Sequence, residues 1–235
     1  MVLNVEAAEL IAEPDPIAKV ISEAMVTAGA GLTGQWRITQ LFRSSGLADE
    51  LLNSLVSPNP ITRAAAAELC GALRLTESVT WLEDLLQDGK PRVREAAVRA
   101  LARLGGRRAV DALMASGNSF PIHRLAIALA SAASDLDIEA LMRQPASEHA
   151  AIVTVLACGL RRDTLRVAPL LGITHDRRWP RQVRIAACKS LGMIGALSSS
   201  DALRMLADKE PDADVKKAAG LAHRRVLRAI AQRPA

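Results

Sequence analysis

The sequence contains almost no aromatic residues. Phenylalanine, tryptophan and tyrosine together make up 2% of the 235 residues, and tyrosine is absent. Half of the residues are nevertheless hydrophobic, and most of them are alanine and leucine, which are strong helix formers. This composition argues against a large β-sandwich and against a typical enzyme fold. It favours helices that pack closely through small side chains.

Cysteine and histidine are also scarce, and their spacing does not suit a metal site. Cys70, Cys158 and Cys188 lie far apart in apolar stretches and form no CxxC pair. This pattern predicts three buried free thiols, which suits a reducing compartment, and no zinc site. The sequence shows no catalytic Ser/His/Asp set, paired-carboxylate motif or glycine-rich phosphate loop. We therefore expect a non-enzymatic protein without a metal or cofactor.

Long hydrophobic runs are missing too. No segment approaches the roughly 18 to 20 uninterrupted apolar residues of a membrane span. The N-terminus lacks the basic start and apolar core of a signal peptide. These features predict a soluble, cytoplasmic chain, which would reach a membrane surface only through a partner or through an anchor that this sequence lacks.

The charge balance is basic but mild. The formal net charge is +5, from 30 Lys and Arg against 25 Asp and Glu, and the sequence pI is about 9.6. Such a balance permits binding to nucleic acid and does not require it.

The dominant feature of the sequence is an internal repeat. In the segment VREAAVRALARLG, which starts at Val93, apolar residues occur at i, i+3, i+4, i+7, i+8 and i+11, which is one face of an α-helix. A basic residue follows the first position, and successive basic residues lie 31 apart from Arg63 to Arg94 and 32 apart from Arg184 to Lys216. Six copies begin at Thr62, Val93, Ile122, Glu148, Val183 and Val215.

A shorter apolar helix is predicted before each copy. The connections carry proline, as in Gln144-Pro145 and Glu210-Pro211, and the hairpins close with glycines at 105, 106 and 195. The predicted short helices span residues 49–56, 79–86, 109–114, 136–142, 164–171 and 201–206.

This pattern resembles the HEAT-repeat family, of the short bacterial type found in bilin-lyase-like proteins. The turn Asp88-Gly89-Lys90-Pro91-Arg92-Val93-Arg94 carries the closest likeness. The resemblance implies an all-α fold, a right-handed α-α superhelix of about six HEAT-like helical hairpins. It also implies that the turn residues tie neighbouring repeats together in a ladder, with Asp88 as one acidic partner of the basic residues Arg63, Arg94, Arg184 and Lys216. His123 and His149 occupy the basic position in the two weakest copies, so we expect the ladder to be broken there.

Two regions are predicted. Residues 1–46 form an N-terminal helical cap or a degenerate repeat, and residues 47–235 form the solenoid. In the first region we expect helices at 5–12, 17–28 and 36–43, with a loop at 29–34. Trp36 and Trp81 are predicted to lie in the core or the cap.

A solenoid of this kind presents a concave face lined by its longer helices. Its mixture of arginine, acid and small apolar residues favours protein recognition over a continuous basic nucleic-acid groove. We therefore predict a protein-binding adaptor or scaffold. Such a protein would suit an accessory role in a membrane-associated complex. The predicted partner-binding residues on this face are Arg92, Glu95, Arg99, Arg103, Arg124 and Lys189.

A second candidate surface combines basic residues with Trp179. A tryptophan beside arginines is a favoured composition for a binding hot spot, although Trp179 could instead pack under its loop as a wedge between repeats. This basic and aromatic cluster comprises Arg161, Arg162, Arg177, Arg178, Trp179 and Arg181.

Three alternatives follow from resemblance. A nucleic-acid-binding solenoid similar to the DNA alkyl-base glycosylases would use Asp176, Arg177 and Trp179. A bilin-lyase-like enzyme would need more aromatic surface than this chain has. Predicted bacterial proteins with a membrane anchor followed by HEAT repeats are similar from Leu41 through the second copy. The sequence leaves the identity of the partner and the oligomeric state open.

Overall fold

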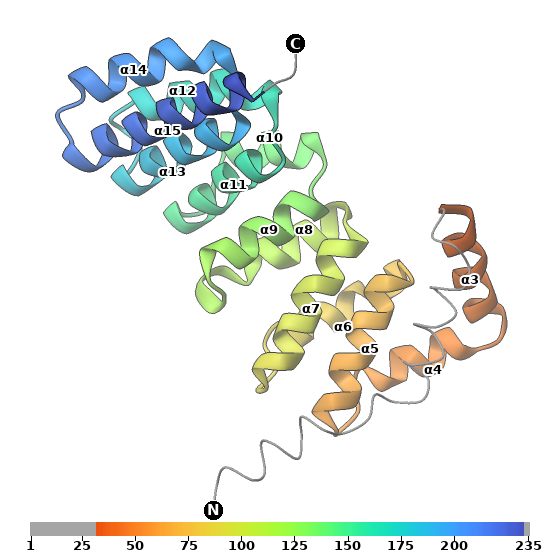
Figure 1. The fold of residues 1–235 in the computed structure, drawn as a ribbon. Helices are drawn as coiled ribbons and strands as arrows, with labels where there is room; N and C mark the ends of the chain where they lie inside the picture. Colours follow the sequence, from red (N-terminus) through yellow and green to blue (C-terminus); the bar gives the residue numbers. More distant parts are fainter. Residues whose placement is uncertain (1–31, 233–235) are drawn as a thin grey trace, which may run out of the picture. The chain divides into compact units, whose positions relative to one another are not determined.

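The computed structural model describes residues 32–232, and every regular element in that range is helical (Figure 1). The all-α fold predicted from the repeat is therefore confirmed. The helices predicted at 5–12 and 17–28 lie outside the described residues. The chain divides into two compact units, residues 1–104 and residues 105–235, which are described separately below.

The part of the first unit that the structure describes starts with helix α3, which contacts the first hairpin. Helix α3 starts at Leu32, inside the loop predicted for 29–34, and its Thr39 hydroxyl donates to the carbonyl oxygen of Leu73 at 2.8 Å. Trp36, predicted for the core or the cap, lies on this helix and is 62% exposed, so it is not a core residue. Between residues 32 and 104 the α-helices are α3 (Leu32–Ser44), α4 (Leu47–Ser54), α5 (Pro60–Ala72), α6 (Val79–Leu85) and α7 (Pro91–Leu104).

The second unit alternates short and long helices in the predicted order. Its short helices are α8 (Gly106–Ala115), α10 (Asp135–Arg143), α12 (Val167–His175) and α14 (Ser200–Lys209). Its long helices are α9 (Ile122–Ala132), α11 (Glu148–Leu160), α13 (Arg181–Ile194) and α15 (Ala213–Ala231).

Helix ends follow the local sequence. Asn59 caps α5 by accepting a hydrogen bond from the Ile61 N–H at 2.9 Å, and Pro60 occupies the first helical position, where its missing N–H costs nothing. Gly195 ends α13 in the left-handed conformation, with φ 67° and ψ 29°, as predicted for a hairpin-closing glycine.

Helix α12 is the largest departure from the predicted boundaries. It spans Val167–His175, whereas a helix was predicted at 164–171. The Asp163 carboxylate accepts the N–H of Leu165 at 3.0 Å and starts a separate 3-10 turn over Thr164–Arg166. The α-helix therefore begins later, with Pro169 in its first turn.

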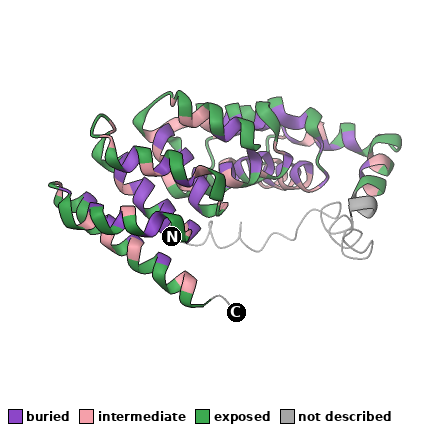
Figure 2. Cartoon of the chain, turned by 90° about the horizontal axis from the view of Figure 1, so that it is seen from above, coloured by how far each residue is buried: buried purple, intermediate pink, exposed green. Residues whose placement is uncertain are grey.

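The core consists mainly of alanine and leucine from the facing sides of the helices. Figure 2 shows the buried residues concentrated on the faces that pack against neighbouring helices. Small residues let the long helices approach closely. A Cβ placed on Gly71 of α5 would lie 2.6 Å from Cα of Ala100 on α7, which is closer than side-chain carbons approach backbone. Trp81, predicted for the core or the cap, is 38% exposed on α6 and is not a core residue.

The predicted ladder is present in the first unit. Arg63 on α5 donates from Nε and Nη2 to the two carboxylate oxygens of Asp88, at 2.8 and 3.1 Å. Arg94 donates from Nη1 to the carbonyl oxygen of the same Asp88, at 2.9 Å. Burial alone would raise the pKa of Asp88, but the hydrogen bonds from Arg63 and from the Lys90 N–H outweigh it and lower that pKa.

The ladder recurs at the C-terminal end of the second unit. Arg184 donates to both carboxylate oxygens of Glu210, at 3.2 and 2.6 Å, and from Nε to the carbonyl oxygen of Thr174 at 3.0 Å. The acid here is the glutamate before Pro211, where the repeat pattern has aspartate. Lys216 donates from Nζ to the carbonyl oxygen of Asp208 at 3.0 Å.

The ladder is interrupted at the two histidine copies, as predicted. His123 is exposed, and the Nε2 atom of His149 is buried without a hydrogen-bond partner. A different arginine connects these repeats. Arg161, at the end of α11, donates to the carbonyl oxygen of Ala133 and to the carboxylate of Asp135.

Candidate functional site

A groove of about 510 Å³ lies on the long helices of the second unit. Its lining comes entirely from α11, α13 and α15, and the short helices of the hairpins contribute nothing to it. The lining residues are Leu156, Gln182, Ile185, Lys189, Met193, Asp214, Lys217, Ala218, Leu221, Ala222 and Arg225.

The helical period explains why these residues share one surface. On α13 the lining positions recur at intervals of three and four residues, from Gln182 through Ile185 and Lys189 to Met193. The opposite side of the same helix carries Val183 and the rest of its buried core. On α15 the same spacing gives the lining residues Asp214, Lys217, Leu221 and Arg225.

The floor of the groove is apolar. Leu156, Ile185 and Met193 are half-buried, and Leu221 exposes 46% of its surface. Partial exposure of several large apolar side chains within one hollow is the usual composition of a binding surface.

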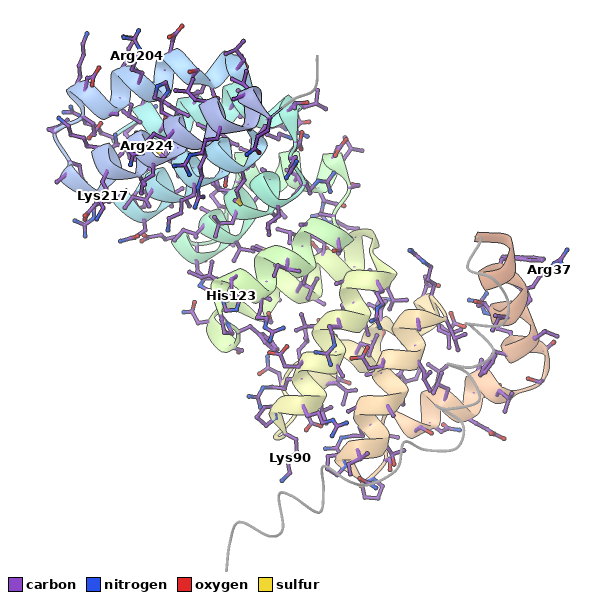
Figure 3. The ribbon with its side chains drawn as sticks, viewed as in Figure 1. Arg37, Lys90, His123, Arg204, Lys217 and Arg224 are labelled. Carbon is purple, nitrogen blue, oxygen red and sulfur yellow. The ribbon has the colours of Figure 1, made fainter. Side chains whose placement is uncertain are left out.

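Three of the five polar residues that line the groove, Lys189, Lys217 and Arg225, are cationic. Asp214 is its one acidic lining residue, and its carboxylate lies 3.4 Å from Nη1 of Arg181. Among the residues that the structure describes, no acidic side chain pairs with Lys189, Lys217 or Arg225. Figure 3 shows Lys217 projecting from α15 on the outside of the helix layer.

The charge of the whole chain is divided unevenly between the two units. Residues 105–235 contain 20 Lys and Arg and 12 Asp and Glu, a net charge of +8. Residues 1–104 contain 10 Lys and Arg and 13 Asp and Glu, a net charge of −3. The mild total of +5 therefore conceals a strongly basic C-terminal unit, and the unpaired cations of the groove belong to it.

A second hollow, of about 720 Å³, adjoins the groove at the C-terminal ends of the same helices. It shares the lining residues Met193 and Arg225 with the groove, so the two hollows are direct neighbours. Its further cations are Arg162 and Arg228, for which no acidic partner occurs among residues 32–232. The basic strip thus extends from the middle of α13 to the end of α15.

The predicted partner-binding residues divide between the units. In the first unit, Arg99 and Arg103 both pair with Glu68 of α5, with N–O distances of 2.6 and 2.7 Å. Glu95 lies 3.8 Å from Arg99, and Arg92 is exposed near the start of α7. This surface largely neutralises its own charge.

The other two predicted partner-binding residues belong to the second unit. Arg124 is exposed on α9 and already takes part in an interaction with another residue of the chain. Lys189 is the member of the predicted set that lies in the groove.

The structure does not bring the predicted basic and aromatic cluster together. Ser190 of α13 donates from Oγ to the carbonyl oxygen of Val155 on α11 at 2.8 Å, so the C-terminal halves of these helices lie side by side. Arg161 and Arg162 follow the end of α11, whereas residues 177–181 precede the start of α13. The two groups therefore lie at opposite ends of the paired helices α11 and α13.

Most cations of that cluster already have acidic partners. Arg178 donates to both carboxylate oxygens of Asp176, and its side-chain hydrogen bond holds the pKa of Asp176 below the ordinary range. Arg161 binds Asp135, and Arg181 binds Asp214. Arg162 and Arg177 are exposed.

Trp179, for which two roles were predicted, is half-buried. It lines a hollow of about 240 Å³ with Met142, Pro169 and Ile173. Because its ring is partly covered by residues of its own chain, it does not present the exposed indole expected of a hot spot.

The three cysteines are free and buried, as predicted. Burial raises the pKa of the thiols of Cys70, Cys158 and Cys188 to about 12. Within the described range, no group of three or more His, Cys, Asp or Glu side chains could hold a metal ion. No helix in that range combines the length and the apolar character needed to cross a bilayer.

The sequence analysis named Lys189 but missed most of the groove, including Leu156, Met193, Leu221 and Arg225. A usable signal was present, because residues 177–200 and 215–232 contain no Asp or Glu at all. Two such long acid-free stretches close together are unusual in a chain with 25 acidic residues.

A profile of HEAT repeats matches residues 48–133 and 136–224, which is most of the chain. The chain is thus an α-solenoid repeat protein. It belongs to the HEAT-repeat family, as the residues around Asp88 predicted.

Several solved structures are similar to this chain at low sequence identity. Human deoxyhypusine hydroxylase is 17% identical, with a TM-score of 0.41, and the alignment covers 90% of this chain and 96% of that one. The CpcE and CpcF complex of phycocyanin lyase from Nostoc sp. PCC7120 is 18% identical, with a TM-score of 0.38 and coverages of 94% and 96%. An engineered protein is 18% identical, with a TM-score of 0.37 and coverages of 94% and 94%. A comparison with curated protein sequences gives no significant match.

Proposed function

We propose that this protein is a non-enzymatic adaptor or scaffold that binds a partner protein through the groove on α11, α13 and α15. One observation carries the proposal: a continuous hollow on the long-helix face combines an apolar floor with cations that the chain itself leaves unpaired. A surface that is apolar at its centre and charged at its edge suits a specific protein interface.

The repeat architecture supports the same function. Stacked hairpins bury a continuous core and leave an extended surface of helix faces, which repeat proteins use for binding. In the first unit, the charged residues on the long helices pair with one another, because Arg99 and Arg103 both form ion pairs with Glu68. In the second unit only Asp214 of the groove is paired, with Arg181, whereas Lys189, Lys217 and Arg225 have no acidic partner among the described residues, so the groove is the better candidate.

The chemistry of the groove favours binding over catalysis. Its lining includes no cysteine, histidine, serine or threonine, and its single carboxylate is paired with Arg181. The thiols of the chain lie in the core with raised pKa values. We accordingly propose a cytoplasmic adaptor, which could also act at a membrane surface through its partner.

The test is affinity capture from a lysate of the source organism with the tagged chain. It is run with and without nuclease, at low and moderate salt. The groove variant is Leu221→Asp, and the matched control is Leu197→Asp, which changes another exposed leucine of the same unit. Capture of a discrete protein by wild type and control, but not by Leu221→Asp, supports the proposal. A protein bound equally by all three chains contradicts it.

A second function, binding of nucleic acid, is favoured by one observation. The basic strip of Lys189, Lys217, Arg225, Arg162 and Arg228 contains no unpaired acid. Phosphate binding weakens steeply as salt rises. Recovery of nucleic acid alone, lost with nuclease or at moderate salt, would favour this second function over the adaptor.

A further inference from the structure

The shape of the groove limits what can occupy it. The lining residues of α13 run from Gln182 to Met193, and those of α15 from Asp214 to Arg225. Each set extends over 11 residue-to-residue steps, or about 16 Å of helix at 1.5 Å per residue. The groove is therefore a valley between two helices, and it is long enough for about three turns of a third helix.

The polar groups of the groove favour a helical occupant over an extended one. An extended peptide needs partners for its own backbone N–H and C=O groups. The lining offers one neutral amide, Gln182, and no hydroxyl group for this purpose. The backbone of a helix satisfies itself, so a helix can lie on the apolar floor of Ile185, Met193 and Leu221 without that cost.

The charge of the groove specifies the sign of the occupant. Lys189, Lys217 and Arg225 stand beside the apolar floor with no acidic partner among the described residues. Acidic side chains flanking the apolar stripe of a bound helix would complete these pairs, whereas basic ones would be repelled. The net charge of +8 on residues 105–235 acts in the same direction.

Nucleic acid fits the groove less well than such a helix. Single strands bind largely by stacking bases on aromatic rings, and the lining contains no aromatic residue. A phosphate backbone would also leave the apolar floor without a partner.

We infer that the groove binds an acidic amphipathic α-helix of about three turns from a partner protein, with apolar residues at i, i+3 or i+4, and i+7 on Ile185, Met193 and Leu221. This inference rests on the proposed function and specifies its partner.

The experiment is an unbiased selection from a displayed library of 20-residue peptides against the full chain. Binders are counter-selected on the chain carrying Ile185→Asp and Leu221→Asp. We expect the enriched peptides to have helical apolar spacing and an excess of Asp and Glu. Enrichment of basic or aperiodic sequences, or no enrichment over the counter-selected chain, overturns the inference.

The strongest enriched peptide is then measured by fluorescence anisotropy. We expect the double variant Lys189→Glu and Lys217→Glu to weaken binding at least tenfold. The matched control reverses two charges on a short helix of the same unit, Arg204→Glu and Lys209→Glu, and is expected to change binding less than threefold. Circular dichroism of each chain checks that it is folded. Equal weakening by both double variants contradicts docking in the groove.

Two further results separate the inference from the proposed function. If the protein captured from lysate is lost with Leu221→Asp but unaffected by Lys189→Glu and Lys217→Glu, the adaptor stands and the acidic helix is wrong. If 20-nucleotide single-stranded or duplex DNA binds at 150 mM salt and is lost with the charge-reversed groove, the helix is wrong and the nucleic-acid function is supported.

Discussion

Arg184 and Glu210 form an ion pair in which both side chains are almost fully buried, with exposed fractions of 6% and 5% and a shortest N–O distance of 2.6 Å. The pair joins the start of α13 to the residue that follows α14. Arg184 also donates to the carbonyl oxygen of Thr174, after which α12 ends within one residue. A single guanidinium thus connects two successive repeats.

Removal of the acid should therefore destabilise the protein strongly. We expect Glu210→Ala to lower the free energy of unfolding by about 3 to 5 kcal/mol, because it leaves the buried Arg184 charge without its partner. The control is Glu68→Ala, which removes an acid paired with Arg99 and Arg103 on an exposed surface and should cost less than about 1 kcal/mol. Urea unfolding followed by circular dichroism measures both. If the two variants lost similar amounts of unfolding free energy, burial of the Arg184–Glu210 pair would not be what makes it important for stability.

The same pair predicts how stability depends on pH. Hydrogen bonding to Arg184 outweighs burial and holds the pKa of Glu210 below its ordinary value of 4.5. A carboxyl whose pKa is lowered by folding stabilises the native state above the unfolded pKa, and this contribution is lost as pH falls through the folded pKa. The difference in stability between wild type and Glu210→Ala should stay constant from pH 7 to 5 and shrink below about pH 4.5. A difference that grew on acidification would show that the sign is wrong.

Close packing of the long helices predicts a cost for a single methyl group. Gly71→Ala places its Cβ 2.6 Å from Cα of Ala100, so α5 and α7 must separate. We expect a loss of about 1 to 3 kcal/mol, despite the better helix propensity of alanine. Gly89→Ala is the control, because a Cβ there meets nothing within 4 Å. Thermal unfolding should give a lower midpoint for Gly71→Ala and an unchanged or slightly higher one for Gly89→Ala.

The three thiols should be inert in the folded protein. Cys70, Cys158 and Cys188 are fully buried, and burial raises their pKa values to about 12, so the reactive thiolate is almost absent at neutral pH. We expect no reaction with a thiol-specific chromogenic reagent under native conditions and three equivalents in denaturant. Rapid labelling of one thiol in the native state would reveal local opening of the helix that carries it.

The periodicity of single helices predicted most of the fold, and the contacts between helices account for what it missed. Arg63 and Asp88 could be paired from sequence because the turn around Pro91 carries a recognisable pattern. Glu68 could not be assigned to Arg99 and Arg103, because that contact depends on how α5 packs along α7. In the same way, residues 161–162 and 177–181 are close in sequence but lie at opposite ends of α11 and α13. Of the predicted site residues, only Lys189 lies in the groove, since the floor around Met193 and Leu221 takes shape only when α13 and α15 lie together.

The uneven distribution of charge also has a kinetic consequence. A net charge of +8 on residues 105–235 creates a long-range field that accelerates the approach of an acidic molecule, whereas contacts on the apolar floor act only after arrival. Added salt should therefore slow association much more than it speeds dissociation. For an encounter with an acidic partner, the lysines and arginines of the C-terminal unit determine how often the two molecules meet, and Ile185, Met193 and Leu221 determine how long they remain together.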